Sequence, residues 1–209
     1  MPNFDEYSTI RQVAIRGANQ AFVSDAKLIA EWQALRFHSK PEFDEAVVEY
    51  ARFRELLGSA GAEIIDLDGA DNLTIDSIYT RDSILICPKG LILCNMGRAS
   101  RTPEATINSA AYSDLGFAVA GQITAPGTLE GGDFIWLDDH HAAVGLGPRT
   151  NAEGIRQLAD ILGPEVELHV VDLPEPDHPD DVLHLMSIIS PIDRDLALIY
   201  RRFMPAETL

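Results

Sequence analysis

Carboxylates and one histidine are the side chains of this sequence best placed to do chemistry. They stand where apolar, strand-like segments begin or end, at Asp76, Asp82, Glu130, Asp133 and His184. If these segments surround a common axis, the side chains meet near its middle, where burial and mutual repulsion perturb pKa values. A channel lined by carboxylates in this way would bind a cation.

Glu130 has the most unusual surroundings of this set. It lies in GTLEGGD, at 127–133, where glycines flank the acid just before an apolar strand. Glycines permit unusual backbone angles and the close approach of a ligand. The alternative is a solvated turn with incidental acids, because Gly and Asp are common turn residues.

His184 lies between Leu183 and Leu185 in an apolar segment, so we expect it to be at least half buried. A structural histidine with satisfied hydrogen bonds is the alternative to a catalytic one. Arg101 and Arg149 occupy matching positions, each just after the second strand of a hairpin. Their guanidinium groups could hold a substrate carboxylate, or each could pair with a carboxylate of a neighbouring unit.

Two similar units must position these residues. Apolar runs at 83–88 and 91–95 are separated by Lys89-Gly90, and runs at 133–137 and 141–146 by a turn at 138–140, which predicts two β-hairpins. A helix should follow each hairpin, from about 101–104 and 149–153, with Thr102 and Thr150 supplying capping chemistry. Before them, the pattern at 41–61 predicts an amphipathic helix and 62–67 a strand.

A third copy begins at 182, with a strand-like segment to 189, a turn at 190–193 and a strand at 196–200. We therefore expect one domain, 1–209, built of units at approximately 62–122, 123–173 and 182–209. Because such a unit cannot bury its apolar face alone, it needs neighbours that complete a shared core. A chain that ends inside a unit is expected to be incomplete.

The composition argues against several classes of binding partner. Hydrophobic residues make up 46% of the 209 residues, and the formal charge of −17 disfavours nucleic acids and anionic lipid surfaces. The two cysteines have no metal-site spacing, and no pattern calls for a metal or organic cofactor. No apolar run approaches the roughly 20 residues that span a bilayer, so we expect a soluble, cytoplasmic protein.

Five short motifs, taken in order, resemble the amidinotransferase and dimethylargininase superfamily. They are IDSIYTRD at 75–82, SRTPE at 100–104, GTLEGGD at 127–133, GPRTN at 147–151 and LHL at 183–185. The resemblance runs from about residue 12 to the last residue. It implies an α/β fold of the pentein type, a five-bladed propeller of ββαβ units around a central channel, incomplete in this chain. Members act on the guanidinium carbon of arginine-like substrates through a cysteine, a histidine and an acid.

The resemblance also implies roles for individual residues. Glu130 would grip the guanidinium group and His184 would be the general acid and base. Asp76 and Asp82 would bind the guanidinium or the amino-acid end of the substrate, and Asp133 would belong to the same substrate site. Arg101 and Arg149 would hold the α-carboxylate. The ligand would be a small guanidino compound, and the family commonly forms homodimers.

Two departures from the family pattern matter. Arg81 stands where several dimethylargininases have an acid. The family's cysteine would lie roughly 70 to 80 residues beyond Leu209, and Cys87 and Cys94 are better explained as small core residues. The function expected is hydrolysis of arginine or methylated arginine to citrulline and an amine or ammonia. Amidino transfer to an acceptor amine and a non-catalytic module that binds an arginine-like ligand are the alternatives.

Overall fold

Both expected hairpins are present in the computed structural model, which describes residues 3–174 and 183–204. Strands β3 (Ile84–Cys87) and β4 (Gly90–Leu93) pair antiparallel across a turn that ends at Gly90, whose φ of +126° favours glycine. Strands β6 (Phe134–Asp138) and β7 (His141–Leu146) form the second hairpin. Apolar runs interrupted by short polar turns therefore predicted these strands correctly.

Each hairpin continues through a helix into a parallel third strand. Helix α4 (Glu104–Asp114) leads to β5 (Val119–Gln122) beside β4, and α5 (Ala152–Leu162) leads to β8 (Glu167–Asp172) beside β7. The two sheets thus have the orders β3-β4-β5 and β6-β7-β8. They repeat one arrangement of hairpin, helix and parallel strand.

The expected threonine caps are wrong. Helix α5 is capped by Asn151, whose side chain accepts the Gly154 amide, and Pro103 stands at the N-cap of α4, where no side-chain cap is formed. Both threonine hydroxyls instead donate elsewhere: Thr102 to the Ala99 carbonyl and Thr150 to Asp133. In the second unit the helix cap thus lies one residue after the predicted threonine, and in the first unit no side chain caps the helix.

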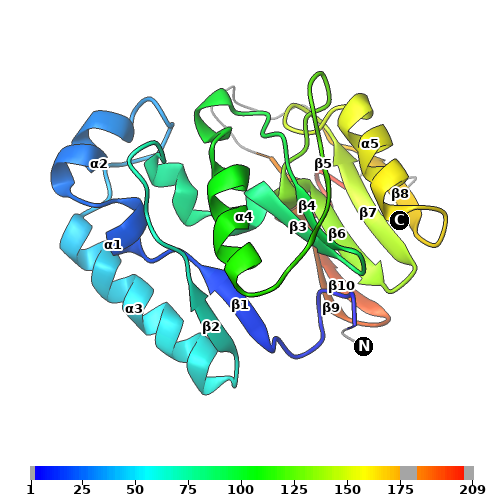
Figure 1. Cartoon of the computed structure of the whole chain (residues 1–209), viewed down its shortest axis with the longest axis horizontal. Coiled ribbons are helices and arrows are strands. Elements are labelled where there is room, and N and C mark those ends of the chain that lie inside the picture. Colours follow the sequence, from blue (N-terminus) through cyan, green and yellow to red (C-terminus); the bar gives the residue numbers. More distant parts are fainter. Residues whose placement is uncertain (1–2, 175–182, 205–209) are drawn as a thin grey trace.

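The amino-terminal part forms a separate two-stranded sheet. Strand β1 (Gln12–Ile15) pairs parallel with β2 (Glu63–Asp66), and the helices α1 (Ala18–Ala21), α2 (Asp25–Glu31) and α3 (Phe43–Ser59) connect them. The helix expected at 41–61 and the strand expected at 62–67 are confirmed as α3 and β2. In Figure 1 these elements lie at one end of the molecule and α5 with β8 at the other, with α4 and the β3-β4-β5 sheet between them.

The third copy differs from its prediction. A single 3-10 turn, η5 (Leu185–Ser187), and strand β9 (Ile189–Asp193) occupy the region expected to be a strand and then a turn, and β10 (Leu196–Ile199) pairs antiparallel with β9. Pro191 misled the prediction, because proline is typical of turns but is also tolerated in a strand at the edge of a sheet. The start of this copy, at 182, lies outside the described residues.

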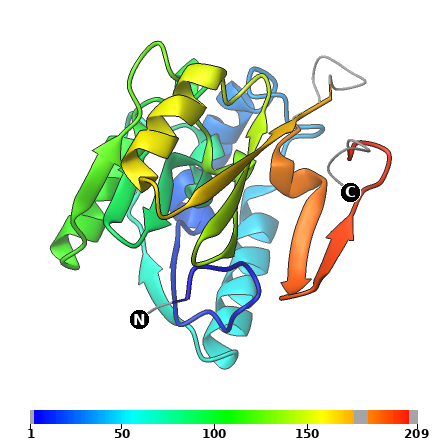
Figure 2. The same cartoon turned by 90° about the vertical axis from the view of Figure 1, so that its right-hand side faces the viewer.

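Apolar layers cover both faces of the β6-β7-β8 sheet. Leu158 and Leu162 of α5 pack on one face, against Phe134, Trp136 and Val144. On the other face η5 and the β9-β10 hairpin contribute the opposite layer, with Leu185, Ile188 and Ile199 against Ile135, Ala143 and Val171. Figure 2 shows the β9-β10 hairpin and α5 on opposite sides of this sheet. The sheet is therefore the rigid support for the residues at its ends.

In the described residues no helix has the length and apolar character needed to cross a membrane.

Candidate functional site

Short 3-10 turns carry nearly all the residues that the sequence marked for chemistry. Asp76 lies in η1 (Ile75–Ile78), Asp82 in η2 (Thr80–Ser83) and Arg101 in η3 (Ala99–Arg101). Asp133 ends η4 (Gly131–Asp133), with Glu130 just before it, and His184 precedes η5. Turn η4 contacts both η2 and η5. Segments far apart in the sequence therefore bring their polar side chains together.

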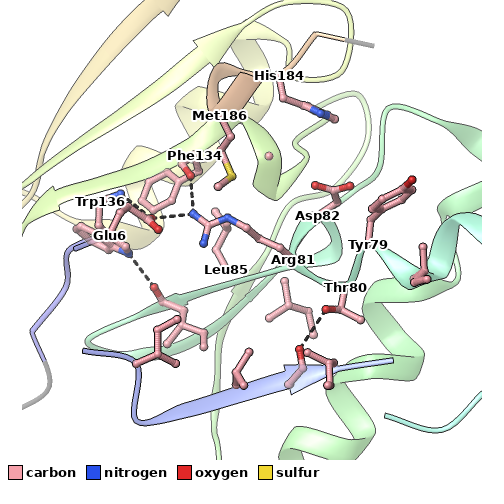
Figure 3. Close-up of a pocket in the computed structure, with 18 of the residues that line it drawn as sticks. Glu6, Tyr79, Thr80, Arg81, Asp82, Leu85, Phe134, Trp136, His184 and Met186 are labelled. Atoms are coloured by element: carbon pink, nitrogen blue, oxygen red, sulfur yellow. Dashed lines mark hydrogen bonds and ion pairs between the residues drawn. The ribbon is translucent and has the colours of Figure 1, made fainter. Parts of the chain in front are cut away.

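A wide, open cavity of about 1600 Å³ lies beside these turns. Its lining includes five of the seven expected site residues: Asp76, Asp82, Arg101, Arg149 and His184. Figure 3 shows Asp82 and His184 facing the same part of the cavity, with Tyr79 and Arg81 on either side of Asp82. Glu130 and Asp133 are both 0% exposed and lie behind the lining residues that the structure describes.

Glu130 joins His184 to Arg149 at the wall of the cavity. The His184 Nε2 atom is 3.0 Å from Glu130 Oε2, and Arg149 Nη1 donates to both Glu130 oxygens at 3.1 Å. The Arg98 amide donates to Glu130 Oε1 at 3.1 Å. A fully buried carboxylate is thus surrounded by donors, as a stable buried charge requires.

The pKa values of this pair move in opposite directions. Burial acts to raise the pKa of Glu130, but the hydrogen bond from His184 and the charge of Arg149 outweigh it and lower the pKa to about 2. Burial acts to lower the pKa of His184, but the hydrogen bond to Glu130 and the charges of Asp133 and Asp82 raise it above its usual value. The pair therefore favours an imidazolium beside a carboxylate, which is a proton donor facing a cavity.

Gly132 lets two of the site's side chains approach the backbone. A Cβ atom at this position would lie 2.8 Å from His184 Cγ and 3.0 Å from Asp82 Oδ1. Any side chain here would therefore displace the histidine, the aspartate or both. The glycines around Glu130 thus serve the approach of protein groups, which the sequence pattern alone could not distinguish from the approach of a ligand.

Arg101 is bound by two carboxylates. Its Nε and Nη2 atoms donate to Glu104 at 2.8 Å each, and Nη1 donates to Asp82 Oδ2 at 2.6 Å. The residue is 3% exposed. Arg101 thus orients Asp82 toward the cavity, whereas the Arg149 side chain, 17% exposed, is the more accessible of the two cations.

Arg98 was missed by the sequence reasoning. It forms an ion pair with Asp76, its Nη1 also donates to the Leu35 carbonyl, and it lines the cavity. The available signal was a second arginine three residues before Arg101, between strand and helix. The equivalent position before Arg149 is Leu146, so a comparison of the two units does not identify Arg98 as a site residue.

Arg81 contacts the amino-terminal segment. Its Nη2 donates to Glu6 Oε1 at 2.7 Å and to the Phe134 carbonyl at 3.0 Å, and Glu6 also accepts the Trp136 amide (Figure 3). The residue that departs from the family pattern therefore belongs to the wall of the cavity.

Cys87 and Cys94 are both buried, with free thiols, in the core between the two sheets. Burial raises the pKa of Cys94, which keeps the thiol protonated and unreactive. Among the described residues that line the cavity, neither cysteine occurs. In the same residues no group of His, Cys, Asp and Glu is arranged to hold a metal ion.

Comparison with known protein families identifies the arginine deiminase model over residues 72–209. An N(G),N(G)-dimethylarginine dimethylaminohydrolase of Streptomyces coelicolor is 30% identical over 170 residues, which are 77% of this chain and 63% of that protein. The Pseudomonas aeruginosa enzyme of the same name is 31% identical over 123 residues, 59% of this chain and 48% of that protein. The chain therefore spans less than two thirds of the length of these curated relatives.

Solved structures agree on the fold. A dimethylarginine dimethylaminohydrolase adduct with 4-chloro-2-hydroxymethylpyridine superimposes with a TM-score of 0.71 and 25% identity, covering 91% of this chain and 68% of that one. An amidinotransferase of the saxitoxin biosynthetic pathway from Microseira wollei gives a TM-score of 0.75 at 16% identity, covering 99% and 71%. The expected α/β pentein-type fold is confirmed.

Proposed function

This chain belongs to the arginine deiminase family, and we propose that its protein hydrolyses a carbon–nitrogen bond of an arginine-like guanidino substrate. The products are citrulline and either ammonia or, from a methylated arginine, a methylamine. The observation that carries this proposal is the 3.0 Å contact between His184 and the buried Glu130 at the wall of an open cavity.

The acids around the cavity are suited to a planar cation. Glu130 and Asp82 would accept hydrogen bonds from the N–H groups of the substrate guanidinium. Asp76, which forms an ion pair with Arg98, would bind the guanidinium or the amino-acid end of the substrate. Keeping the guanidinium charged makes its carbon more electrophilic. Arg149 now holds both oxygens of Glu130, so substrate binding requires this arginine to move.

A moving Arg149 has a natural second partner in the α-carboxylate of the substrate. The incoming guanidinium replaces the arginine at Glu130, while the carboxylate replaces Glu130 at the arginine. Each of the four charged groups then has a partner of opposite charge, so that no ion is left buried and unpaired. Arg101 contributes its positive charge nearby while it continues to hold Asp82.

The proposed chemistry starts with a cysteine thiolate that forms a bond to the guanidinium carbon. The bond from that carbon to the departing nitrogen breaks, and the proton of the His184 imidazolium passes to that nitrogen. Neutral His184 then takes one proton from a water whose oxygen attacks the same carbon. The carbon–sulfur bond breaks, the thiolate is restored, and the other proton of the water reaches the released amine through solvent.

The nucleophile is proposed to be a cysteine outside these 209 residues, since Cys87 and Cys94 are both buried core residues. The natural protein would then have a mass above the 22.9 kDa of this chain. A homodimer is a further proposal, which rests on the family resemblance, and so is the cytoplasmic location, which rests on the sequence pattern.

The test is product analysis with the full natural protein and arginine, mono- and dimethylarginine or agmatine as substrate. Citrulline from one of the arginines supports hydrolysis, and its loss in Glu130→Gln and His184→Asn would support the assigned roles. Protein that is folded but silent toward all these compounds would exclude the proposal. A new guanidino compound formed with glycine or lysine present would mean transfer instead, and binding without turnover would mean a non-catalytic module.

A further inference from the structure

Asp133 is expected from the resemblance to belong to the substrate site, but both of its carboxylate oxygens already accept hydrogen bonds from protein groups. It is 0% exposed and lies behind the described lining of the cavity. Its Oδ1 atom accepts the Leu185 amide at 3.0 Å, and its Oδ2 atom accepts the Thr150 hydroxyl at 2.7 Å. Leu185 directly follows His184, so one oxygen of Asp133 holds the backbone beside the catalytic histidine.

The Thr150 hydroxyl extends this contact to the catalytic acid. Thr150 is 0% exposed, and its single hydroxyl proton goes to Asp133. The oxygen is therefore turned so that it accepts the Glu130 amide, at 3.2 Å. A hydroxyl has one donor and can accept at the same time, so Asp133 fixes the direction in which Thr150 accepts.

We infer that Asp133 is a positioning residue that holds Glu130 and His184 in register with each other through Thr150 and the Leu185 amide. It acts without touching substrate, in place of the substrate-binding role that the family resemblance implied. The segments that it joins are 130–133 and 150, which belong to one unit of the fold, and 184–185, which belongs to the next. This inference rests on the proposed function, because the pair that it positions is the proposed catalytic pair.

Charge supports the same assignment. Burial raises the pKa of Asp133 to about 6, so its carboxylate is largely ionised at neutral pH, in keeping with the two donors that it accepts. Its charge also helps to raise the pKa of His184, together with those of Glu130 and Asp82. Loss of this charge should therefore lower the pKa of His184, which loss of a hydrogen bond within the fold alone would not do.

The experiment compares Asp133→Asn, Thr150→Val and Thr150→Ser in the full natural protein. Two properties are measured: the pKa of His184, from the pH dependence of its imidazole NMR signals, and kcat with KM for the substrate. Asp133→Asn keeps the size of the side chain and removes its charge. Thr150→Val removes the hydroxyl, and this variant keeps the test possible if Asp133→Asn fails to fold. Thr150→Ser keeps a hydroxyl at this position and is the matched control.

We expect Asp133→Asn to lower the His184 pKa and shift the pH profile of kcat toward lower pH. Because small displacements of catalytic groups are costly, Thr150→Val should reduce kcat by roughly 10- to 100-fold with little change in KM, and Thr150→Ser should recover most of it. Raised KM at unchanged kcat would show substrate contact and overturn the inference. So would an unchanged His184 pKa in Asp133→Asn together with unchanged kcat in Thr150→Val. If the protein turns over no guanidino compound but the His184 pKa still falls in Asp133→Asn, the proposed function fails, while the electrostatic coupling of Asp133 to His184 stands.

Discussion

The stretches Arg101-Thr102-Pro103 and Arg149-Thr150-Asn151 occupy the same place in two similar units, between the hairpin and the helix. Arg101 is held by Glu104 of its own helix and by Asp82, whereas Arg149 reaches across to Glu130. Thr102 is exposed and its hydroxyl donates to the nearby Ala99 carbonyl, whereas Thr150 is buried between Asp133 and Glu130.

The comparison shows how the same stretch of two similar units can have different interaction partners. The position of the three residues is set locally, by the strand before them and the helix after them. Their partners differ: the first stretch has a partner in its own helix, Glu104, whereas the second binds Glu130 and Asp133 of the segment before β6. The first stretch supports Asp82, while the second contacts the Glu130–His184 pair itself.

The largest expected effect separates the two arginines. Arg101→Ala would leave Glu104, 1% exposed, and Asp82 without their shared cation, and we expect a loss of about 3 to 5 kcal/mol in the free energy of unfolding. Arg149→Ala should cost less, about 1 to 3 kcal/mol, because Glu130 keeps His184 and the Arg98 amide. Urea denaturation of both variants measures this, and equal losses would mean that the two arginines have the same structural role.

The carboxylate partners of the two arginines should respond to pH in opposite ways. The pKa of Glu130 is lowered to about 2, against burial, by His184 and Arg149, so its stabilisation is present above pH 4.5 and is lost as the pH falls from 4.5 through 2. Burial raises the pKa of Glu104 in spite of Arg101, so the folded state binds this proton more tightly and stability from this group falls as the pH rises through and above 4.5.

Variants without the charge isolate each contribution. Relative to Glu130→Gln, the wild type should gain on the order of 3 kcal/mol as the pH rises through this range. Relative to Glu104→Gln, it should lose stability as the pH rises above 4.5. Urea denaturation at several pH values gives both difference curves, and two curves of the same slope would contradict the opposite environments of the two acids.

The threonines give the next largest contrast. Thr150→Val leaves the Asp133 Oδ2 atom and the Glu130 amide without their shared partner, which should cost about 1 to 3 kcal/mol of unfolding free energy. Thr102→Val, at the exposed matching position, should stay within about 0.5 kcal/mol of the wild type. Thermal or urea unfolding compares the two, and a similar cost at both positions would mean that the buried network adds nothing.

These contrasts also mark what the sequence could predict. The hairpins at 84–93 and 134–146 followed from apolar runs separated by turn residues, which is local information. That Glu130 and His184 meet depended on contacts between segments more than 50 residues apart, which the family resemblance supplied. The role of Asp133 could not be predicted, because whether a carboxylate faces a cavity or lies behind it depends on the packing of all its neighbours.

The smallest contrast concerns the third residue of each stretch. Asn151 Oδ1 accepts the Gly154 amide at 2.8 Å, which caps α5, and the Thr128 amide at 3.0 Å, which joins the helix to the segment before Glu130. Asn151→Ala should therefore cost about 1 kcal/mol, whereas Pro103→Ala, at an α4 terminus with no side-chain cap, should change stability by less than about 0.5 kcal/mol. Asn151→Asp keeps an oxygen that accepts from both amides and loses the donation to the Pro126 carbonyl, so it should recover most of the loss. If Asn151→Asp is as unstable as Asn151→Ala, the cap is not the main contribution of this residue, and the bond to Pro126 holds the Glu130 segment instead.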